Sequence, residues 1–271
     1  MTDLWSDLLD CLDLRPLPGA PGTAASFEGG NQRLTYHRLF GGQLLAQSVT
    51  AARLACPGKS VKSLHVLFPR AGTAEEPVRY EVELHHEGRT FASLTIRAVQ
   101  PQAGVIAIAS VSLHANEDGR DHQTIDPVPA VPGPEHVLQL GLLPWETRSA
   151  IDLDSPKPEP PELELWMRTP ATDPALATAV AAYATDLTLI GTALRPIDGV
   201  SQRDAGTAFT SAVTSHSVWF HRPFRTDGWL LLRQHSPLLA HGRGFGRGDL
   251  LTEDGSLVAS YAQESLVRFQ S

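Results

Sequence analysis

Polar side chains stand at three places in otherwise apolar parts of the sequence, where they could activate a water molecule. Asp186 follows an alanine-rich segment, and Gln263 lies within an apolar stretch near the C-terminus. Hydroxyl residues, including Thr214, precede a Trp-Phe-His segment at 219–221. A carboxylate can remove a proton from water, while an amide and a hydroxyl can hold the water and polarise its target. Such a set predicts hydrolysis without a metal ion and without a covalent intermediate.

Asp186 and Gln263 each have a structural interpretation as well. A buried carboxylate is costly unless it is paired or hydrogen-bonded, so Asp186 could simply bond a nearby backbone amide. Gln263 could be an edge-strand amide that faces water. Asp186 is still the best candidate base in the chain, because it lies close to Thr185 and Thr188 in an apolar predicted helix.

Two predicted helices carry the corresponding positions. The segment 174–190 begins with an Asp-Pro cap, and its apolar residues recur at the spacings of a helix. The segment 40–55 predicts a second helix, in which Gln47 holds the place of Asp186. Since an amide cannot act as a base, we expect chemistry only in the second half of the chain. The glycines at 41–42 either offer free amide donors to a ligand or let this helix pack closely.

Other features also recur, about 150 positions apart. A Val-x-Phe-x-Arg pattern at 66–70 returns at 218–222, and Gly-Arg-x-Phe at 88–91 returns at 242–245. Strand-like segments follow each helix, and none of the helices alternates with single strands as parallel βαβ units require. The sequence therefore predicts an α+β protein in which one unit, an antiparallel sheet curled around a central helix, is used twice.

The predicted strands and the prolines set the expected domain limits. In the first half, strands are expected at 61–68, at 78–99 as a hairpin, and at 104–114. Prolines are concentrated between 126 and 161. We expect an N-terminal repeat at 1–120, a proline-rich linker at 121–162, and a C-terminal repeat at 163–271 that carries the catalytic residues.

Composition excludes several classes of protein. The net charge of -8 argues against a nucleic-acid groove, which needs clustered Lys and Arg. Cys11 and Cys56 are far apart and indicate neither a disulfide framework nor a zinc site. We expect no membrane span, because no segment matches the required uncharged apolar run. The first 14 residues are typical of an acidic amphipathic helix rather than a signal peptide, so we expect a cytoplasmic protein.

Other chemistries find little support in the motifs. No Gly-x-Ser-x-Gly elbow is present, and neither cysteine lies in a plausible acid-base setting. The histidines, among them His216, His221 and His235, show no metal-ligand spacing. The glycine-rich run 242–248 contains two arginines and precedes no helix, which favours a bulged strand over a phosphate loop. We expect neither a metal nor a cofactor.

At these residues the chain resembles the acyl-CoA thioesterase II family of double hotdog hydrolases. The resemblance spans nearly the whole length, and the segments that carry it are Phe40-Gly41-Gly42-Gln43, Ala182-Tyr183-Ala184-Thr185-Asp186-Leu187, Trp219-Phe220-His221-Arg222-Pro223-Phe224, Arg243-Gly244-Phe245, Arg247-Gly248, and Val258-Ala259-Ser260 with Gln263-Glu264. It implies hydrolysis of fatty acyl-CoA to a free fatty acid and coenzyme A, in lipid metabolism, by a protein that forms a homo-oligomer.

The resemblance also implies roles for particular residues. Asp186 would be the base that orients the water, Gln263 its amide partner, and Thr214 its hydroxyl partner. The family places the hydroxyl six positions before the Trp, where this chain has Val213. Thr214 therefore needs a one-residue deletion or bulge to reach the site, and Ser215, which shares the strand face of Val213, is its rival.

Two rival functions are compatible with the same fold. An acyl-CoA hydratase would place a histidine beside the aspartate, but the predicted helix has no Asp-x-x-x-x-His. A non-catalytic acyl-CoA binding or sensing protein would have lost the site, and the shifted threonine would be the sign of that loss. The presence of both Asp186 and Gln263 favours the hydrolase.

Overall fold

The computed structural model describes residues 4–19, 22–34 and 38–270. By its internal contacts the chain forms two compact units, Met1–His122 with Ala175–Ala184, and Gln123–Pro174 with Thr185–Ser271. Contacts do not decide where a sequence repeat begins, so the expected domain limits stay a prediction. The first three residues of the expected N-terminal helix lie outside the described residues; that helix, α1, runs from Leu4–Leu12.

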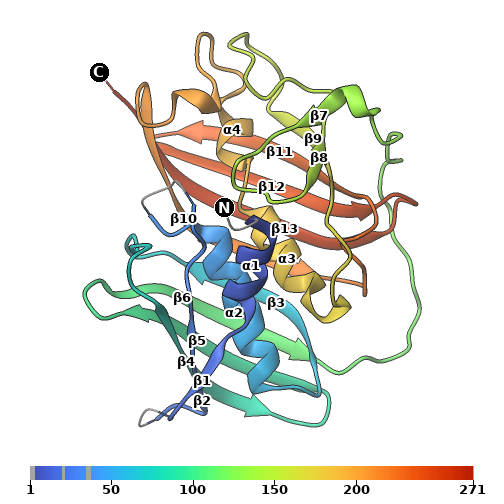
Figure 1. Cartoon of the computed structure of the whole chain (residues 1–271). Coiled ribbons are helices and arrows are strands. Elements are labelled where there is room, and N and C mark those ends of the chain that lie inside the picture. The colour runs from blue at the N-terminus through green and yellow to red at the C-terminus, as the bar shows by residue number, and fades with distance from the viewer. Residues whose placement is uncertain (1–3, 20–21, 35–37, 271) are drawn as a thin grey trace. The chain divides into compact units, whose positions relative to one another are not determined.

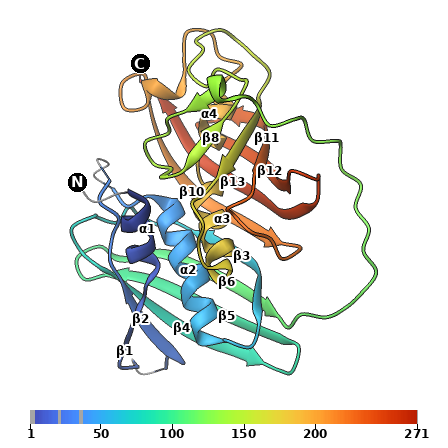
Figure 2. The same cartoon turned by 45° about the vertical axis from the view of Figure 1, so that its right-hand side comes forward.

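The first unit is an antiparallel sheet with helix α2 (Gly41–Ala55) lying across one face (Figure 2). In spatial order its strands are β1 (Arg15–Leu17), β2 (Ala25–Gly29), β4 (Val78–Glu87), β5 (Phe91–Gln100), β6 (Gly104–His114) and β3 (Ser60–Leu67). Helix α1 packs against α2. The expected hairpin at 78–99 and the expected strand at 104–114 are both confirmed.

Small residues on α2 allow neighbouring backbone to come very close. A Cβ added at Gly42 would lie 2.5 Å from the carbonyl oxygen of Tyr183, which belongs to the same unit. The ring of Phe40 meets that of Tyr183 edge-on at 4.9 Å. Of the two interpretations of this glycine pair, close packing accounts for Gly42.

The second unit is also an antiparallel sheet, shown with its helix α4 (Leu189–Leu194) in Figure 1. In spatial order its strands are β10 (Phe209–Phe220), β13 (Leu257–Phe269), β12 (Arg243–Thr252), β11 (Leu230–Ala240), β9 (Glu162–Arg168), β8 (Glu146–Arg148) and β7 (Val137–Leu138). Short 3-10 helices occur at Pro134–His136, Pro174–Leu176 and Gln202–Asp204. The proline-rich segment thus contributes two short strands to this sheet.

The glycine-rich run lies in β12 and lets α4 approach the sheet. A Cβ at Gly246 would meet the Ser236 hydroxyl oxygen at 2.5 Å and the Leu189 side chain at 2.8 Å. The irregularity of pairing lies in the neighbouring strand β11, between His235 and Leu238. The run is therefore a strand, as expected, and its glycines make room for a helix.

The expected single helix over 174–190 is wrong. The structure has α3 (Ala177–Thr185), a break at 186–188, and then α4. Thr188 takes a left-handed conformation with φ of 72°, which stops helical continuation. The Gln234 side chain of β11 donates to the Leu187 carbonyl at 3.2 Å and accepts from the Thr188 hydroxyl at 2.8 Å, so these two polar groups of the break are satisfied. Asp186 consequently lies in the break.

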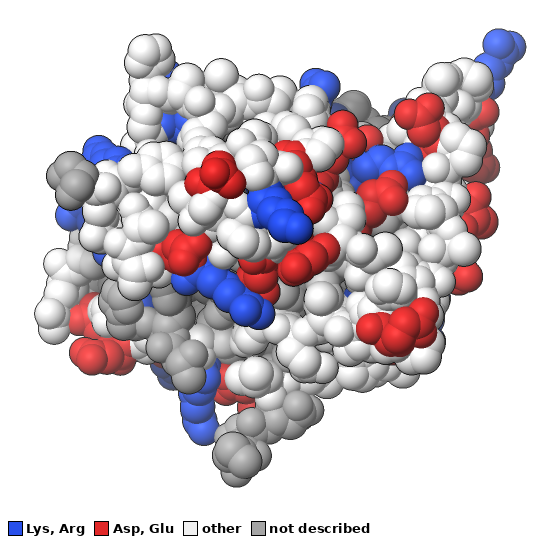
Figure 3. Space-filling view, turned by 90° about the horizontal axis from the view of Figure 1, so that it is seen from above, with Lys and Arg blue, Asp and Glu red and all other residues white. Residues whose placement is uncertain are grey.

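Two further features are the hydropathy of one segment and the distribution of charge on the surface. Among the described residues, the segment Pro174–Leu194 is apolar and long enough to cross a membrane by composition alone, although 67% of its most apolar window is buried inside the protein. Core helices of globular proteins pass the same test. On the described residues visible in Figure 3, acidic and basic side chains are interspersed without a continuous basic patch.

Candidate active site

Two strands of the second unit bring His216 and Gln263 side by side. The two residues are direct partners in the antiparallel pairing of β10 with β13, so their side chains share one face of the sheet. His216 is fully buried and Gln263 is 3% exposed. Alternation along β10 places Val218 and Phe220 on the same buried face. Both polar side chains are therefore inside the unit.

The histidine connects the helix break to the last strand. Its Nδ1 lies 3.0 Å from Oε1 of Gln263, and its Nε2 lies 3.0 Å from the hydroxyl of Thr185 at the end of α3. Oδ1 of Asp186 lies 4.0 Å from the same Nδ1. The structure thus places both Asp186 and Gln263 near the same ring nitrogen of His216.

In the sequence, His216 is distinguished only as one of several histidines without metal-ligand spacing. His216 lies three residues before Trp219, at one of the alternate strand positions that face the interior, and this position was a usable signal. The partners that make it informative, Thr185 and Gln263, are distant in sequence, so the pattern alone did not reveal the cluster. Among the described residues, no group of three or more His, Cys, Asp or Glu side chains is arranged to hold a metal ion.

Burial controls the charge of this cluster. Desolvation lowers the pKa of His216 from 6.5 to about 4, although its hydrogen bond to Gln263 favours the protonated form. The ring of Tyr261 stacks on the histidine at 6.1 Å, and burial raises the pKa of that phenol. At neutral pH the imidazole is therefore uncharged, with one N–H and one acceptor nitrogen.

The amide of Gln263 still has hydrogen-bonding capacity. Its Oε1 is engaged by His216, while its Nε2 is buried and has no hydrogen-bond partner among the residues the structure describes. A buried amide with unsatisfied donors costs about 1–3 kcal/mol, so such a group calls for an explanation. A bound substrate oxygen or water would satisfy it.

The candidate hydroxyl, that of Thr214, lies on β10 next to Glu264, the residue that follows Gln263 in β13. The pairing of β10 with β13 shifts between Val213 and Ser215, so the bulge that Thr214 requires is present. The Thr214 hydroxyl donates to the main-chain carbonyl of Glu264 at 3.0 Å, and Ser215 lies opposite the same residue. The choice between Thr214 and Ser215 stays a prediction.

The corresponding place in the first unit is occupied by a fully bonded amide. Nε2 of Gln47 donates to the carbonyls of Cys11 and Gly30, each at 2.8 Å. Its Oε1 accepts from the Tyr80 hydroxyl at 2.6 Å and from Gln43 at 3.1 Å. All four hydrogen-bonding positions are used, so Gln47 has a structural role.

A second cluster of polar side chains lies on the opposite face of the second sheet. Ser260 donates to Asp249 at 2.7 Å and lies 3.0 Å from Nε2 of His221. In a nucleophilic triad the histidine stands between the serine and the carboxylate, whereas here the serine does. This order does not activate Ser260 as a nucleophile.

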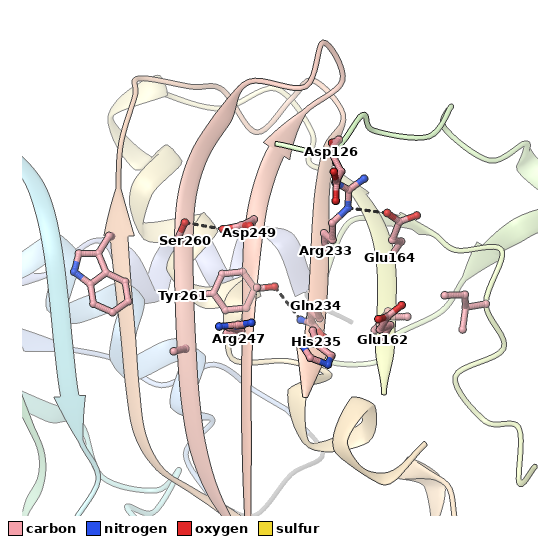
Figure 4. Close-up of a pocket in the computed structure, with 15 residues that line it drawn as sticks. Asp126, Glu162, Glu164, Arg233, Gln234, His235, Arg247, Asp249, Ser260 and Tyr261 are labelled. Atoms are coloured by element: carbon pink, nitrogen blue, oxygen red, sulfur yellow. Dashed lines mark hydrogen bonds and ion pairs between the residues drawn. The ribbon is translucent and has the colours of Figure 1, made fainter. Parts of the chain in front are cut away.

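The same opposite face holds a cavity of about 770 Å³ (Figure 4). Asp249, Ser260, Arg247 and His235 line it. Because side chains alternate along a strand, residues such as Ser260 face away from the side that carries Gln263. Tyr261 and Gln234 also line the cavity, and because the Tyr261 ring stacks on His216, the cavity borders the His216 cluster.

Comparison with known proteins agrees with this architecture. Residues 32–114 match the model of the acyl-CoA thioesterase N-terminal domain, and residues 116–267 match that of the C-terminal domain. Acyl-CoA thioesterase 2 of Haemophilus influenzae is 30% identical over 99% of both chains. The crystal structure of an acyl-CoA thioesterase II from Mycobacterium marinum is 32% identical, covers 97% of this chain and 98% of its own, and superposes with a TM-score of 0.78.

A more distant structure, a hot dog fold protein of unknown function from Alicyclobacillus acidocaldarius, is 19% identical over 97% of this chain and 98% of its own, with a TM-score of 0.73. It supports the fold alone. The chain belongs to the acyl-CoA thioesterase family. It is an acyl-CoA thioester hydrolase with the hotdog fold, as the sequence motifs predicted.

Proposed function

We propose that this hydrolase cleaves fatty acyl-CoA with a water molecule activated by Asp186, with Gln263 and the hydroxyl of Thr214 as its partners. The observation that supports this most strongly is that the Asp186 carboxylate and the Gln263 amide both lie near Nδ1 of buried His216, at 4.0 Å and 3.0 Å, while Nε2 of Gln263 has no hydrogen-bond partner among the described residues. A general base and an amide donor are what water attack on a thioester needs.

The chemistry follows from the two groups. Asp186 takes a proton from water, and the resulting hydroxide attacks the thioester carbonyl carbon. Nε2 of Gln263 donates to the oxygen on which negative charge develops, or to the attacking water. The carbon–sulfur bond then breaks, the thiolate of coenzyme A leaves, and Asp186 gives it the proton that it took from the water. The products are a free fatty acid and coenzyme A, and neither a metal nor a covalent intermediate takes part.

The test is release of free thiol from medium-chain and long-chain acyl-CoA, followed with a disulfide reagent. Asp186→Asn keeps the shape of the side chain but removes the base, so we expect a loss of about 100-fold or more. Asp249→Asn, on the opposite face of the sheet, is the matched control and keeps the wild-type rate. Equal rates for the two variants would remove Asp186 from the mechanism.

Two rival functions can be separated by the same assay. Binding of acyl-CoA without thiol release would mean a non-catalytic acyl-CoA sensor. One observation favours a hydratase. Nδ1 of His216 lies 4.0 Å from Oδ1 of Asp186, although the histidine comes from a strand and not from the helix. Both ring nitrogens of His216 are engaged by protein groups, which leaves it no proton to exchange with substrate. Loss of the enoyl absorbance of a 2-enoyl-CoA without thiol release would favour the hydratase.

We further propose a cytoplasmic homo-oligomer without a membrane span. Cys11 and Cys56 are both free and buried, in keeping with a reducing compartment. Large apolar side chains remain exposed on strands of the first unit, including Leu67 at 59% and Phe91 at 45%, and such groups are typical of surfaces that pair with another copy. Light scattering on the purified protein tests the assembly, and a monomer at all concentrations would contradict it.

A further inference from the structure

His216 is a buried ionisable residue that the proposed mechanism leaves without a part. It contacts no solvent, and its two ring nitrogens each lie 3.0 Å from a protein oxygen, that of Gln263 on one side and that of Thr185 on the other. Burial keeps it neutral, which excludes a role as a charged partner of Asp186. A neutral imidazole held from both sides can still fix the orientation of a neighbour.

The surroundings of the ring select one tautomer. Oε1 of Gln263 can only accept a hydrogen bond, so the nitrogen facing it must carry the proton. The Asp186 carboxylate lies 4.0 Å from the same Nδ1 and also favours a proton there. Nε2 is then an acceptor, and the hydroxyl of Thr185 donates to it. Every contact is consistent with the Nδ1–H form.

The orientation of Gln263 depends on this proton. An amide can rotate by half a turn and exchange its oxygen for its nitrogen at little steric cost. An Nδ1–H donor accepts only the oxygen as partner, which leaves both N–H groups of Nε2 pointing elsewhere. Nε2 is itself buried and has no hydrogen-bond partner in the described part of the chain.

We propose that His216 is a positioning residue for thioester hydrolysis: its Nδ1–H holds the oxygen of Gln263 so that the Gln263 N–H donors face the reacting group. This rests on the proposed function of Gln263 and adds the reason why its amide points the useful way. Asp186 has a second task in this arrangement, since its carboxylate favours the histidine tautomer that orients the amide.

The tautomer is measured directly, without reference to activity. Nitrogen-15 NMR of the histidine-labelled protein distinguishes a protonated from an unprotonated ring nitrogen, and the spectrum of His216→Asn identifies the signal that belongs to His216. We expect a proton on Nδ1 at neutral pH. A proton on Nε2 would overturn the proposal, because Nδ1 would then accept from the Gln263 amide and turn its nitrogen inward.

Steady-state kinetics test whether the histidine acts through the amide. His216→Phe keeps a planar ring without donors, and we expect kcat to fall about 10- to 100-fold while KM changes less than about threefold, since an oriented donor acts mainly in the transition state. His216→Asn, whose side-chain N–H can replace Nδ1–H, should lose less. His235→Phe, on the other face of the sheet, is the control for the substitution itself.

The decisive comparison is a double-mutant cycle with Gln263→Leu. If His216 works through Gln263, the His216→Phe change costs less than about twofold once the amide is gone. A full loss in both backgrounds would show a general packing role and refute the positioning role. If the wild type releases no thiol, the proposed function fails and the positioning role in hydrolysis fails with it, whereas an Nε2 proton in an active enzyme refutes the positioning role alone.

Discussion

The buried histidine predicts how the stability of the protein depends on pH. The folded-state pKa of His216 is about 4, against an ordinary value of 6.5. Between these values the unfolded chain binds a proton at this residue and the folded chain does not. Stability from this group is therefore fully present above about pH 6.5 and is lost as the pH falls toward 4. A difference of about 2.5 pKa units corresponds to about 3 kcal/mol of unfolding free energy.

The variant His216→Asn isolates this contribution. Urea unfolding of wild type and variant, followed by tryptophan fluorescence at several pH values, gives the difference in unfolding free energy between them. We expect that difference to shrink by about 3 kcal/mol between pH 7 and pH 4, because the asparagine has no proton to gain. Burial also lowers the pKa of His65 and His221, but these residues are present in both proteins and cancel. His235→Asn serves as the control.

Charged neighbours decide whether the prediction holds. In the described part of the chain, the ionisable side chains of Asp186 and Tyr261 lie near the histidine, at 4.0 Å from Nδ1 and in a ring stack at 6.1 Å. If the Asp186 carboxylate at 4.0 Å fully compensated the imidazolium, the difference between wild type and His216→Asn would stay constant with pH. A constant difference would thus refute the claim that His216 is held neutral by burial, and with it the hydrogen-bonding pattern derived from a neutral ring.

Three further substitutions follow from the packing and the hydrogen bonds. Gly42→Ala should lower the unfolding free energy by about 1–3 kcal/mol through its clash with a carbonyl, whereas Gly58→Ala, with open space around it, should change little in thermal unfolding. Gln47→Leu removes four hydrogen bonds, including those to the buried Tyr80 hydroxyl and the Cys11 carbonyl, and should cost more than about 3 kcal/mol, while the folded fraction still releases thiol at the wild-type rate. Thr214→Val should lower kcat at least about 10-fold and Ser215→Ala less than about twofold, and the reverse result would give the hydroxyl role to Ser215.

Local patterns were sufficient for most of the fold. Period-two alternation predicted β4, and the helical spacing of apolar and small residues over 40–55 predicted α2. The break at 186–188 was not predictable in this way, because the residue that stabilises it is Gln234 in a distant strand. By helix propensity this segment is continuous and apolar, and only the tertiary hydrogen bonds explain why the helix stops.

Gln47 and Gln263 show what the sequence pattern alone does not distinguish. Gln47 and Gln263 both stand in apolar segments, and a resemblance to a family was needed to separate them. In the folded chain the difference is physical: the amide of Gln47 has all four of its hydrogen-bonding positions filled, while Nε2 of Gln263 has no partner among the described residues. A saturated buried amide stabilises the fold, and an unsaturated one beside a carboxylate has capacity left for a substrate. That capacity depends on which strands pair, and a sequence pattern does not contain the pairing.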